Sequence, residues 1–170
     1  RKRIIAESSI SSRVLVVKEF DGTIVRFLPD NYHEVSWAND SKAFVAVANG
    51  FKVVINSADE NIEEFVLADR TGANLLGGPV WSPDGKWIAF YYFERGAKNP
   101  YIELMRPDGK EKRSLTNVEG LHPELAWSPD SKLLAVTPIR GKIQIIDIDS
   151  GSVIFTLPAD IIENLVSPQW

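Results

Sequence analysis

A ten-residue pattern recurs along the chain at a nearly constant interval. The segment Trp81-Ser-Pro-Asp-Gly-Lys-Trp-Ile-Ala-Phe90 returns as Trp127-Ser-Pro-Asp-Ser-Lys-Leu-Leu-Ala-Val136 and, more loosely, as Trp37-Ala-Asn-Asp-Ser-Lys-Ala-Phe-Val-Ala46. These tryptophans are separated by 44 and 46 residues, and Trp170 follows Trp127 after a further 43. A fixed interval of this length indicates that one structural unit is repeated and that neighbouring copies pack on one another.

Each repeat is predicted to form four short strands. In the third repeat, Ser82-Pro83-Asp84-Gly85 is a turn, because Pro presets φ, Asp caps backbone N–H groups and Gly accepts positive φ. Asp108-Gly109 predicts a hairpin between the third and fourth strands. The segments between the turns are β-branched and aromatic, and no segment carries a sustained apolar stripe at helical spacing. The strands expected in this repeat are 79–81, 86–93, 101–106 and 112–115.

A period of about 40–45 residues with four strands per unit is typical of a β-propeller blade. The chain resembles the TolB-type, WD40-like repeat called PD40, through its Trp-Ser-Pro-Asp-Gly-Lys pattern, the apolar strand after it and a later strand ending in Asp-Gly. The second repeat departs from this pattern at Ala38-Asn39, and the N-terminal repeat lacks the Trp. The Gly-His and Trp-Asp pairs of WD40 repeats proper are absent. We therefore expect an all-β fold, a β-propeller of four-stranded antiparallel blades with about four repeats.

The repeats are expected to form a single TolB-like domain over residues 1–170. Arg3-Ile4-Ile5-Ala6 aligns with Lys86-Trp87-Ile88-Ala89, so the chain starts just after one first strand and ends just after another. Pairing between these ends would close a four-bladed ring and leave no free sheet edge. The expected repeats are roughly 1–28 plus 166–170, 29–77, 78–117 and 118–165.

Two other arrangements are open. The repeats form an arc of a larger ring, since TolB-like propellers commonly have six or more blades, or two chains join into one eight-bladed ring. An arc would expose the apolar faces of its end blades and should associate. A homo-oligomer is therefore expected if one chain does not close the ring.

The repeated side chains predict packing and turn formation rather than ligand binding. A tryptophan that recurs in every unit is expected to pack between blades. Trp87 falls outside that register, at a position occupied by Ala43 and Leu133 in other repeats, and is also expected in the core. The turn aspartates are expected to cap backbone N–H groups, because a calcium site would need several oxygens converging on one point. These aspartates are Asp40, Asp84 and Asp130.

Composition and motifs argue against several classes of function. The net charge of −4 and the pI of about 5.2 argue against a nucleic-acid surface, and no apolar run reaches the roughly 18 residues of a membrane span. The chain has no Cys, no Gly-x-Ser-x-Gly elbow and only two isolated histidines. Gly77-Gly78 precedes Pro79 and a strand, not a phosphate-binding helix. We expect no enzyme activity, no cofactor and no metal.

The candidate binding residues lie where an outer strand connects to the next inner strand. In propellers these connections surround one mouth of the central channel, where partners usually dock. The resulting face should be acidic and aromatic, and protonation of its histidines would reduce its acidity. The candidates are Tyr32, His33, Glu34, Glu119, His122 and Asp160.

The resemblance also carries expectations about function. TolB-like propellers serve envelope assemblies in bacteria and bind a peptidoglycan-associated lipoprotein and other Tol partners. The resemblance therefore implies a non-catalytic module with a protein or peptide partner, in a periplasmic or extracytoplasmic compartment. Similar repeats form the gating propellers of prolyl-oligopeptidase-like and tricorn-like peptidases. The alternative is thus a substrate-gating propeller whose catalytic domain is absent from this chain.

Overall fold

The computed structural model consists of β-strands joined by turns and loops. It describes residues 3–7, 15–19, 21, 23–58, 64–73, 75–115, 118, 121–139 and 142–157. These residues form fifteen strands in four antiparallel sheets and contain no helix. Within this part of the chain, no helix is long and apolar enough to cross a membrane. The prediction of an all-β fold built from four-stranded antiparallel sheets is confirmed.

The strands of every sheet follow one another in chain order. The first sheet contains β1 (Arg3–Glu7), β2 (Leu15–Glu19) and β3 (Ile24–Phe27). The second contains β4 (Tyr32–Trp37), β5 (Ala43–Ala48), β6 (Lys52–Ser57) and β7 (Phe65–Asp69). The third contains β8 (Leu75–Trp81), β9 (Ile88–Phe93), β10 (Tyr101–Met105) and β11 (Lys112–Ser114). The fourth contains β12 (Leu121–Trp127), β13 (Leu133–Ile139), β14 (Ile143–Asp147) and β15 (Val153–Leu157).

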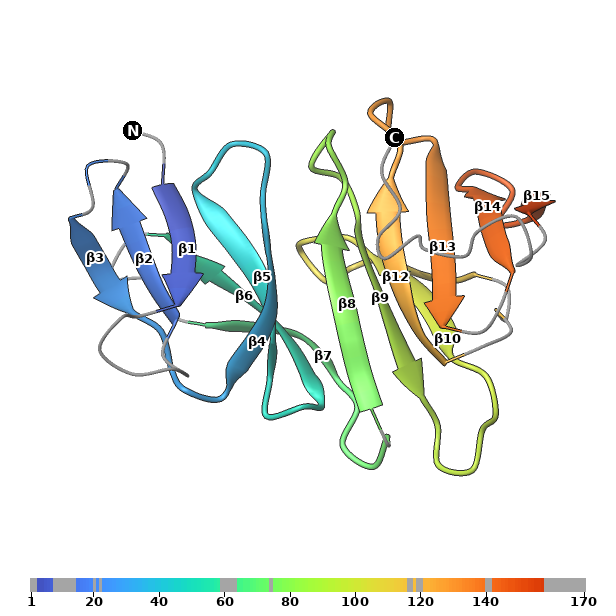
Figure 1. The fold of residues 1–170 in the computed structure, drawn as a ribbon, viewed down its shortest axis with the longest axis horizontal. Helices are drawn as coiled ribbons and strands as arrows, with labels where there is room; N and C mark the ends of the chain where they lie inside the picture. The colour runs from blue at the N-terminus through green and yellow to red at the C-terminus, as the bar shows by residue number, and fades with distance from the viewer. Residues whose placement is uncertain are drawn as a thin grey trace.

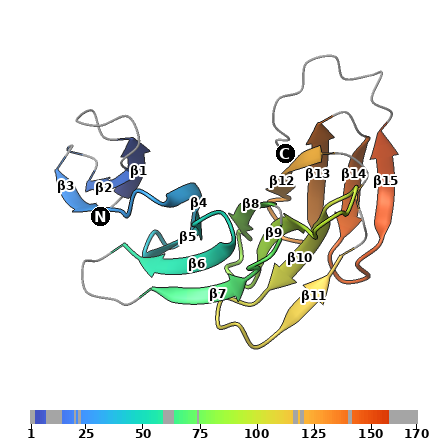
Figure 2. The same cartoon turned by 90° about the horizontal axis from the view of Figure 1, so that it is seen from below.

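The four sheets are arranged as blades along an arc. Figure 1 shows the first and fourth sheets at opposite ends of the molecule, and Figure 2 shows the same arc from below. The first strands of the second, third and fourth sheets, β4, β8 and β12, contact one another in that order and lie on the concave side of the arc. The strand predicted to close a four-bladed ring, 166–170, lies outside the described residues.

The sheets pack face to face because their middle strands bury both faces. Successive side chains of a strand point to opposite sides of the sheet. In β5, Phe44 and Ala46 contact a cluster formed with the first sheet, whereas Val45 and Val47 contact a cluster formed with the third sheet. All four side chains are completely buried. A middle strand therefore has a continuous apolar run, and the second and third blades each pack against a neighbour on both sides.

The repeated tryptophans lie in the seams between blades, as predicted. Trp37 packs against the cluster between the first and second sheets, Trp81 against the next cluster, and Trp127 belongs to the cluster between the third and fourth sheets. Trp127 Nε1 donates a hydrogen bond to the Val80 carbonyl of the preceding blade at 3.1 Å. Trp170 lies outside the described residues.

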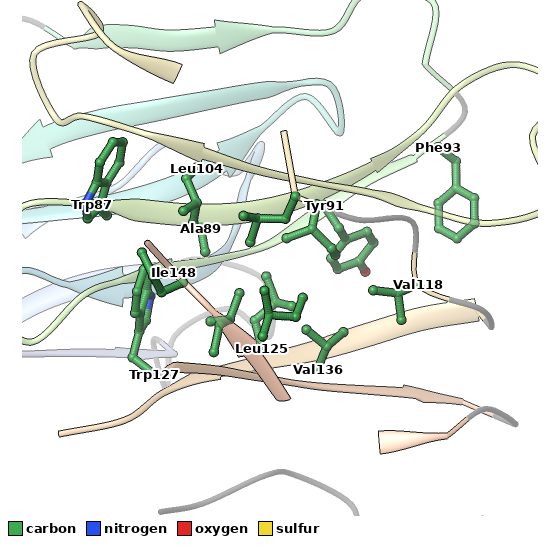
Figure 3. Close-up of a cluster of buried hydrophobic side chains, with 14 residues drawn as sticks. Trp87, Ala89, Tyr91, Phe93, Leu104, Val118, Leu125, Trp127, Val136 and Ile148 are labelled. Carbon is green, nitrogen blue, oxygen red and sulfur yellow. The ribbon is translucent and has the colours of Figure 1, made fainter. Parts of the chain in front are cut away.

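Trp87 is part of the core, also as predicted. Its side chain is 7% exposed and belongs to the cluster between the third and fourth sheets. Figure 3 shows Trp87 and Ala89 in this cluster with Leu125 and Trp127 of the fourth sheet. The guanidinium groups of Arg106 and Arg113 lie 4.4 Å and 4.7 Å from the ring centroid of Trp87. The side chain is thus held by packing and by cation–π contacts.

The turn aspartates cap backbone N–H groups, which confirms the prediction from the sequence. Asp84 Oδ1 accepts hydrogen bonds from Ser82 Oγ at 2.7 Å and from the Lys86 N–H at 3.1 Å. Asp130 accepts the equivalent pair of bonds in the next repeat, and Asp40 accepts one from the backbone two residues ahead. Burial raises the pKa of Asp84, but the bonds from Ser82 and Lys86 outweigh it, so that the pKa is lowered.

The equivalent turn position has positive φ in all three repeats. Gly85 occupies it with φ of 73°, whereas serine occupies it at Ser41, with φ of 58°, and at Ser131, with φ of 61°. A non-glycine residue in this region is strained by about 1–2 kcal/mol. Ser131 has a compensating role, since its Oγ accepts a hydrogen bond from the Asp84 N–H at 3.0 Å across the seam.

We predict that Ser41→Gly stabilises the protein by about 1 kcal/mol, because glycine removes the strain at this turn. Gly85→Ser should destabilise it by a similar amount. Urea unfolding followed by circular dichroism measures both changes. Ser41→Ala is the matched control, since it keeps the Cβ and should gain little. A loss of stability in Ser41→Gly would contradict the prediction.

Candidate functional site

The first strands of the blades extend further than the sequence indicated. The first strand of the third repeat was expected at 79–81, but β8 covers Leu75–Trp81. The connections predicted to carry the binding residues are accordingly shorter. His33 and His122 lie within β4 and β12, not in loops. This corrects the prediction of their location, and its cause is a bulge that interrupts the apparent strand pattern.

Each of the three inner strands carries an irregularity at the same place. The pairing register shifts between His33 and Ser36 in β4, between Gly77 and Val80 in β8, and before Glu124 in β12. A β-bulge inserts an extra residue and turns its side chain out of the regular alternation. The equivalent residue, three positions before the seam tryptophan, is Glu34, Gly78 or Glu124. Glu34 and Gly78 both have positive φ, at 50° and 61°.

Glu34, Gly77, Gly78 and Tyr91 form the centre of the candidate site. The Gly78 N–H donates a hydrogen bond to the Glu34 carboxylate on the neighbouring inner strand. A Cβ added at Gly77 would lie 2.6 Å from Glu34 Oε2 and 2.8 Å from Tyr91 Oη, so both oxygens converge on that point. Glycine is required here because any side chain would displace one of these groups.

Tyr91 supplies a neutral phenol to this site. The side chain is 5% exposed and packs in the cluster between the third and fourth sheets. Burial raises the pKa of Tyr91 to about 12, with further contributions from the carboxylates of Glu34 and Glu124. The hydroxyl therefore keeps its proton at physiological pH. It offers one donor and two acceptor lone pairs.

The site is an electronegative patch beside the inner strands β4, β8 and β12. Glu34 and Glu124 are exposed and lie on inner strands that flank β8. Neither carboxylate has an ion pair with a lysine or arginine among the described residues. Two exposed carboxylates beside a phenol favour a ligand that carries N–H donors and positive charge. The group defined by Glu34, Gly77, Gly78, Tyr91 and Glu124 is called the channel site below.

The other predicted residues have different surroundings. Tyr32 is 5% exposed, and its hydroxyl donates to the Glu64 carboxylate and accepts from Asn56 Nδ2 at 3.1 Å. It therefore fixes β4 to β6 within the blade. His33 is exposed beside Glu34. Glu119, Asp160 and the side chain of His122 lie outside the described residues.

Tyr91 and the two glycines were not among the residues predicted from the sequence. In the sequence, Tyr91 is one more aromatic residue in a strand expected to be buried, and Gly77-Gly78 suggests at most a phosphate-binding loop. An alignment of the repeats could have indicated the glycines, since Gly78 occupies the position that is Glu34 and Glu124 in the other repeats.

Comparison with known proteins identifies relatives of this fold. A family model for the WD40 domain of anaphase-promoting complex subunit 4 matches residues 81–163. The Tol-Pal system protein TolB of Alcanivorax borkumensis is 32% identical over 98 residues, which is 52% of this chain and 22% of that protein. The uncharacterized peptidase YuxL of Bacillus subtilis is 35% identical over 69 residues, which is 41% of this chain and 10% of that protein. The chain thus spans less than a quarter of the length of either relative.

The crystal structure of TolB from Acinetobacter baumannii has a similar fold. It superimposes with a TM-score of 0.67 at 23% identity, and the match covers 89% of this chain and 40% of that one. The likeness extends over nearly the whole arc.

We predict that Gly77→Ala lowers the free energy of unfolding by about 1–3 kcal/mol, because the new Cβ would overlap Glu34 Oε2 and the Tyr91 ring. Thermal and urea unfolding measure the loss. In a protein that already carries Glu34→Ala and Tyr91→Leu, Gly77→Ala should lower the free energy of unfolding by less, since the atoms that its Cβ would overlap are gone. An equal cost in both backgrounds would show that the close approach is not the cause.

Proposed function

Because the chain belongs to the TolB-like family of WD40-like β-propeller repeats, we propose that it is a non-catalytic binding module that holds a protein or peptide partner at the channel site. The proposal includes the binding residues predicted from the sequence, of which Glu34 belongs to the site and His33 is its neighbour in the chain. Its support is the close approach of Glu34 Oε2 and the Tyr91 hydroxyl at Gly77, with Glu124 near enough to help raise the pKa of Tyr91. The Alcanivorax relative, named a Tol-Pal system protein, is consistent with a protein partner.

The chemistry of the channel site defines what the partner presents. Two carboxylates without a basic counterpart attract a lysine, an arginine or an amino terminus. The Tyr91 hydroxyl accepts a further hydrogen bond from such a group, and its raised pKa keeps it neutral. The rigid strands around the glycines hold these acceptors in place, so little ordering is needed when the partner binds.

A second candidate function is that of a substrate-gating propeller of a peptidase. Its support is the match to the peptidase YuxL, which is 35% identical over 69 residues. In that setting, the channel site would favour peptides with basic residues on their way to a catalytic domain. Both functions use the channel site, and they differ in whether the bound peptide is cleaved by an attached domain.

We predict that a fluorescein-labelled pentalysine peptide binds saturably at low ionic strength and that Glu34→Gln with Glu124→Gln weakens its binding at least about fivefold, because the two attracting charges are lost. Fluorescence anisotropy measures both dissociation constants. The matched control is Asp108→Asn with Asp149→Asn, two exposed residues away from the inner strands. The control should weaken binding less than about twofold. Equal weakening in the two variants would rule out a role for the channel site.

A further inference from the structure

A recess separate from the channel site lies in the seam between the second and third sheets. Its volume is about 390 Å³, within the range of small-ligand pockets. Both blades contribute to it, through the connection from β7 to β8 and through the strands β9, β10 and β11. We call it the seam groove. The lining residues that matter below are Asp69, Arg70, Tyr92, Arg95, Glu103 and Lys112.

The floor of the seam groove is a buried ion pair that joins the two blades. The Glu103 side chain is only 2% exposed, and its carboxylate accepts a hydrogen bond from Arg70 Nη2. The Arg70 guanidinium also lies over the Tyr92 ring, 4.9 Å from its centroid. A carboxylate buried to this degree requires a fixed positive partner. The pair therefore holds a planar guanidinium at a defined place in the groove.

The groove has basic groups in addition to the one that pairs with Glu103. Lys112 Nζ lies 3.7 Å from the second Glu103 oxygen, while the Lys112 side chain remains 65% exposed. Arg95 is exposed and has no ion pair within the described part of the chain. Arg70 has donors left, since its guanidinium carries five N–H groups and the bonds it makes are to Glu103 and, at 3.4 Å, to a backbone carbonyl.

The acidic groups of the groove are largely compensated. Glu103 is matched by Arg70, and Asp69 lies 3.8 Å from Lys52 Nζ outside the groove. Asp69 also accepts a hydrogen bond from the Thr71 N–H at 2.9 Å. Glu94 at the margin is the acidic residue left to oppose Arg95 and Lys112. The lining has three acidic and three basic side chains, and Lys52 beside Asp69 adds a fourth basic one, so the groove with Lys52 has one positive charge in excess, although the whole chain has a net charge of −4.

We propose that the seam groove binds the carboxylate side chains of an acidic peptide segment. The two exposed cations supply the attraction, and the fixed Arg70 guanidinium supplies a planar set of donors that suits a carboxylate. The groove would give the partner at the channel site a second point of attachment, and this role rests on the proposed function. The two sites lie at the same end of the third sheet, because Tyr92 pairs with Leu76, the residue before Gly77.

The two sites together specify a partner with separated charges. The channel site takes a basic group and the seam groove takes an acidic segment, so a partner must present both in the matching order. A partner with the charges reversed would place like charges against each other at both sites, which is costly and suppresses the wrong orientation.

The test uses a fluorescein-labelled pentaglutamate peptide and the whole chain. We expect saturable binding at low ionic strength, measured by fluorescence anisotropy, and a loss of about fivefold or more in Arg95→Gln with Lys112→Gln. Both residues are exposed, so their replacement should leave thermal unfolding unchanged. The matched control is Lys42→Gln with Lys132→Gln, two exposed lysines in the turns before β5 and β13, with an expected loss below about twofold.

The outcomes separate this proposal from the function of the channel site. Absence of saturable pentaglutamate binding, or equal weakening in the groove variant and the control, would overturn the seam groove. Glu34→Gln with Glu124→Gln should leave pentaglutamate binding intact or strengthen it, and a loss there comparable to the groove variant would also count against the proposal. Pentaglutamate binding without pentalysine binding would support the groove and reject the channel site.

Discussion

Burial of the middle strands on both faces is the constraint on which the rest of the structure depends. β5 and β9 are apolar at nearly every position because each face meets a different blade. The second and third blades each bury both faces against a neighbour, which makes the arc cooperative from seam to seam. The tryptophans fill these seams, and the bond from Trp127 Nε1 to the Val80 carbonyl ties one blade to the backbone of the previous one.

This packing leaves few places where a polar group can serve another purpose. Most side chains on the middle strands are committed to the core, so most of the available positions lie on the inner strands and on the blade ends. The bulges in β4, β8 and β12 create such positions, because each frees one residue from the regular pairing. The seams create others where residues of two blades meet, as Arg70 and Glu103 do.

The sequence was informative where structure is set locally. The spacing of the tryptophans and the Ser-Pro-Asp-Gly turns depends on a few neighbouring residues, and both predictions are confirmed by the seam packing and by the capped turns at Asp84 and Asp130. The location of His33 was wrong, because a bulge breaks the alternation by which a strand is recognised. The partnership of Arg70 with Glu103 joins residues 33 positions apart in different repeats, and no pattern within one repeat indicates it.

The channel site arises where the repeats differ from one another. Three glutamates at the equivalent bulge position would bring three like charges together at the inner strands. The third sheet has Gly78 instead, and its N–H donates to the Glu34 carboxylate that a third glutamate would repel. The space without side chains at Gly77 and Gly78 is occupied by Tyr91, whose ring reaches the site from the core. A strict repeat builds the scaffold, and glycine in one copy makes one of the three equivalent positions differ from the other two.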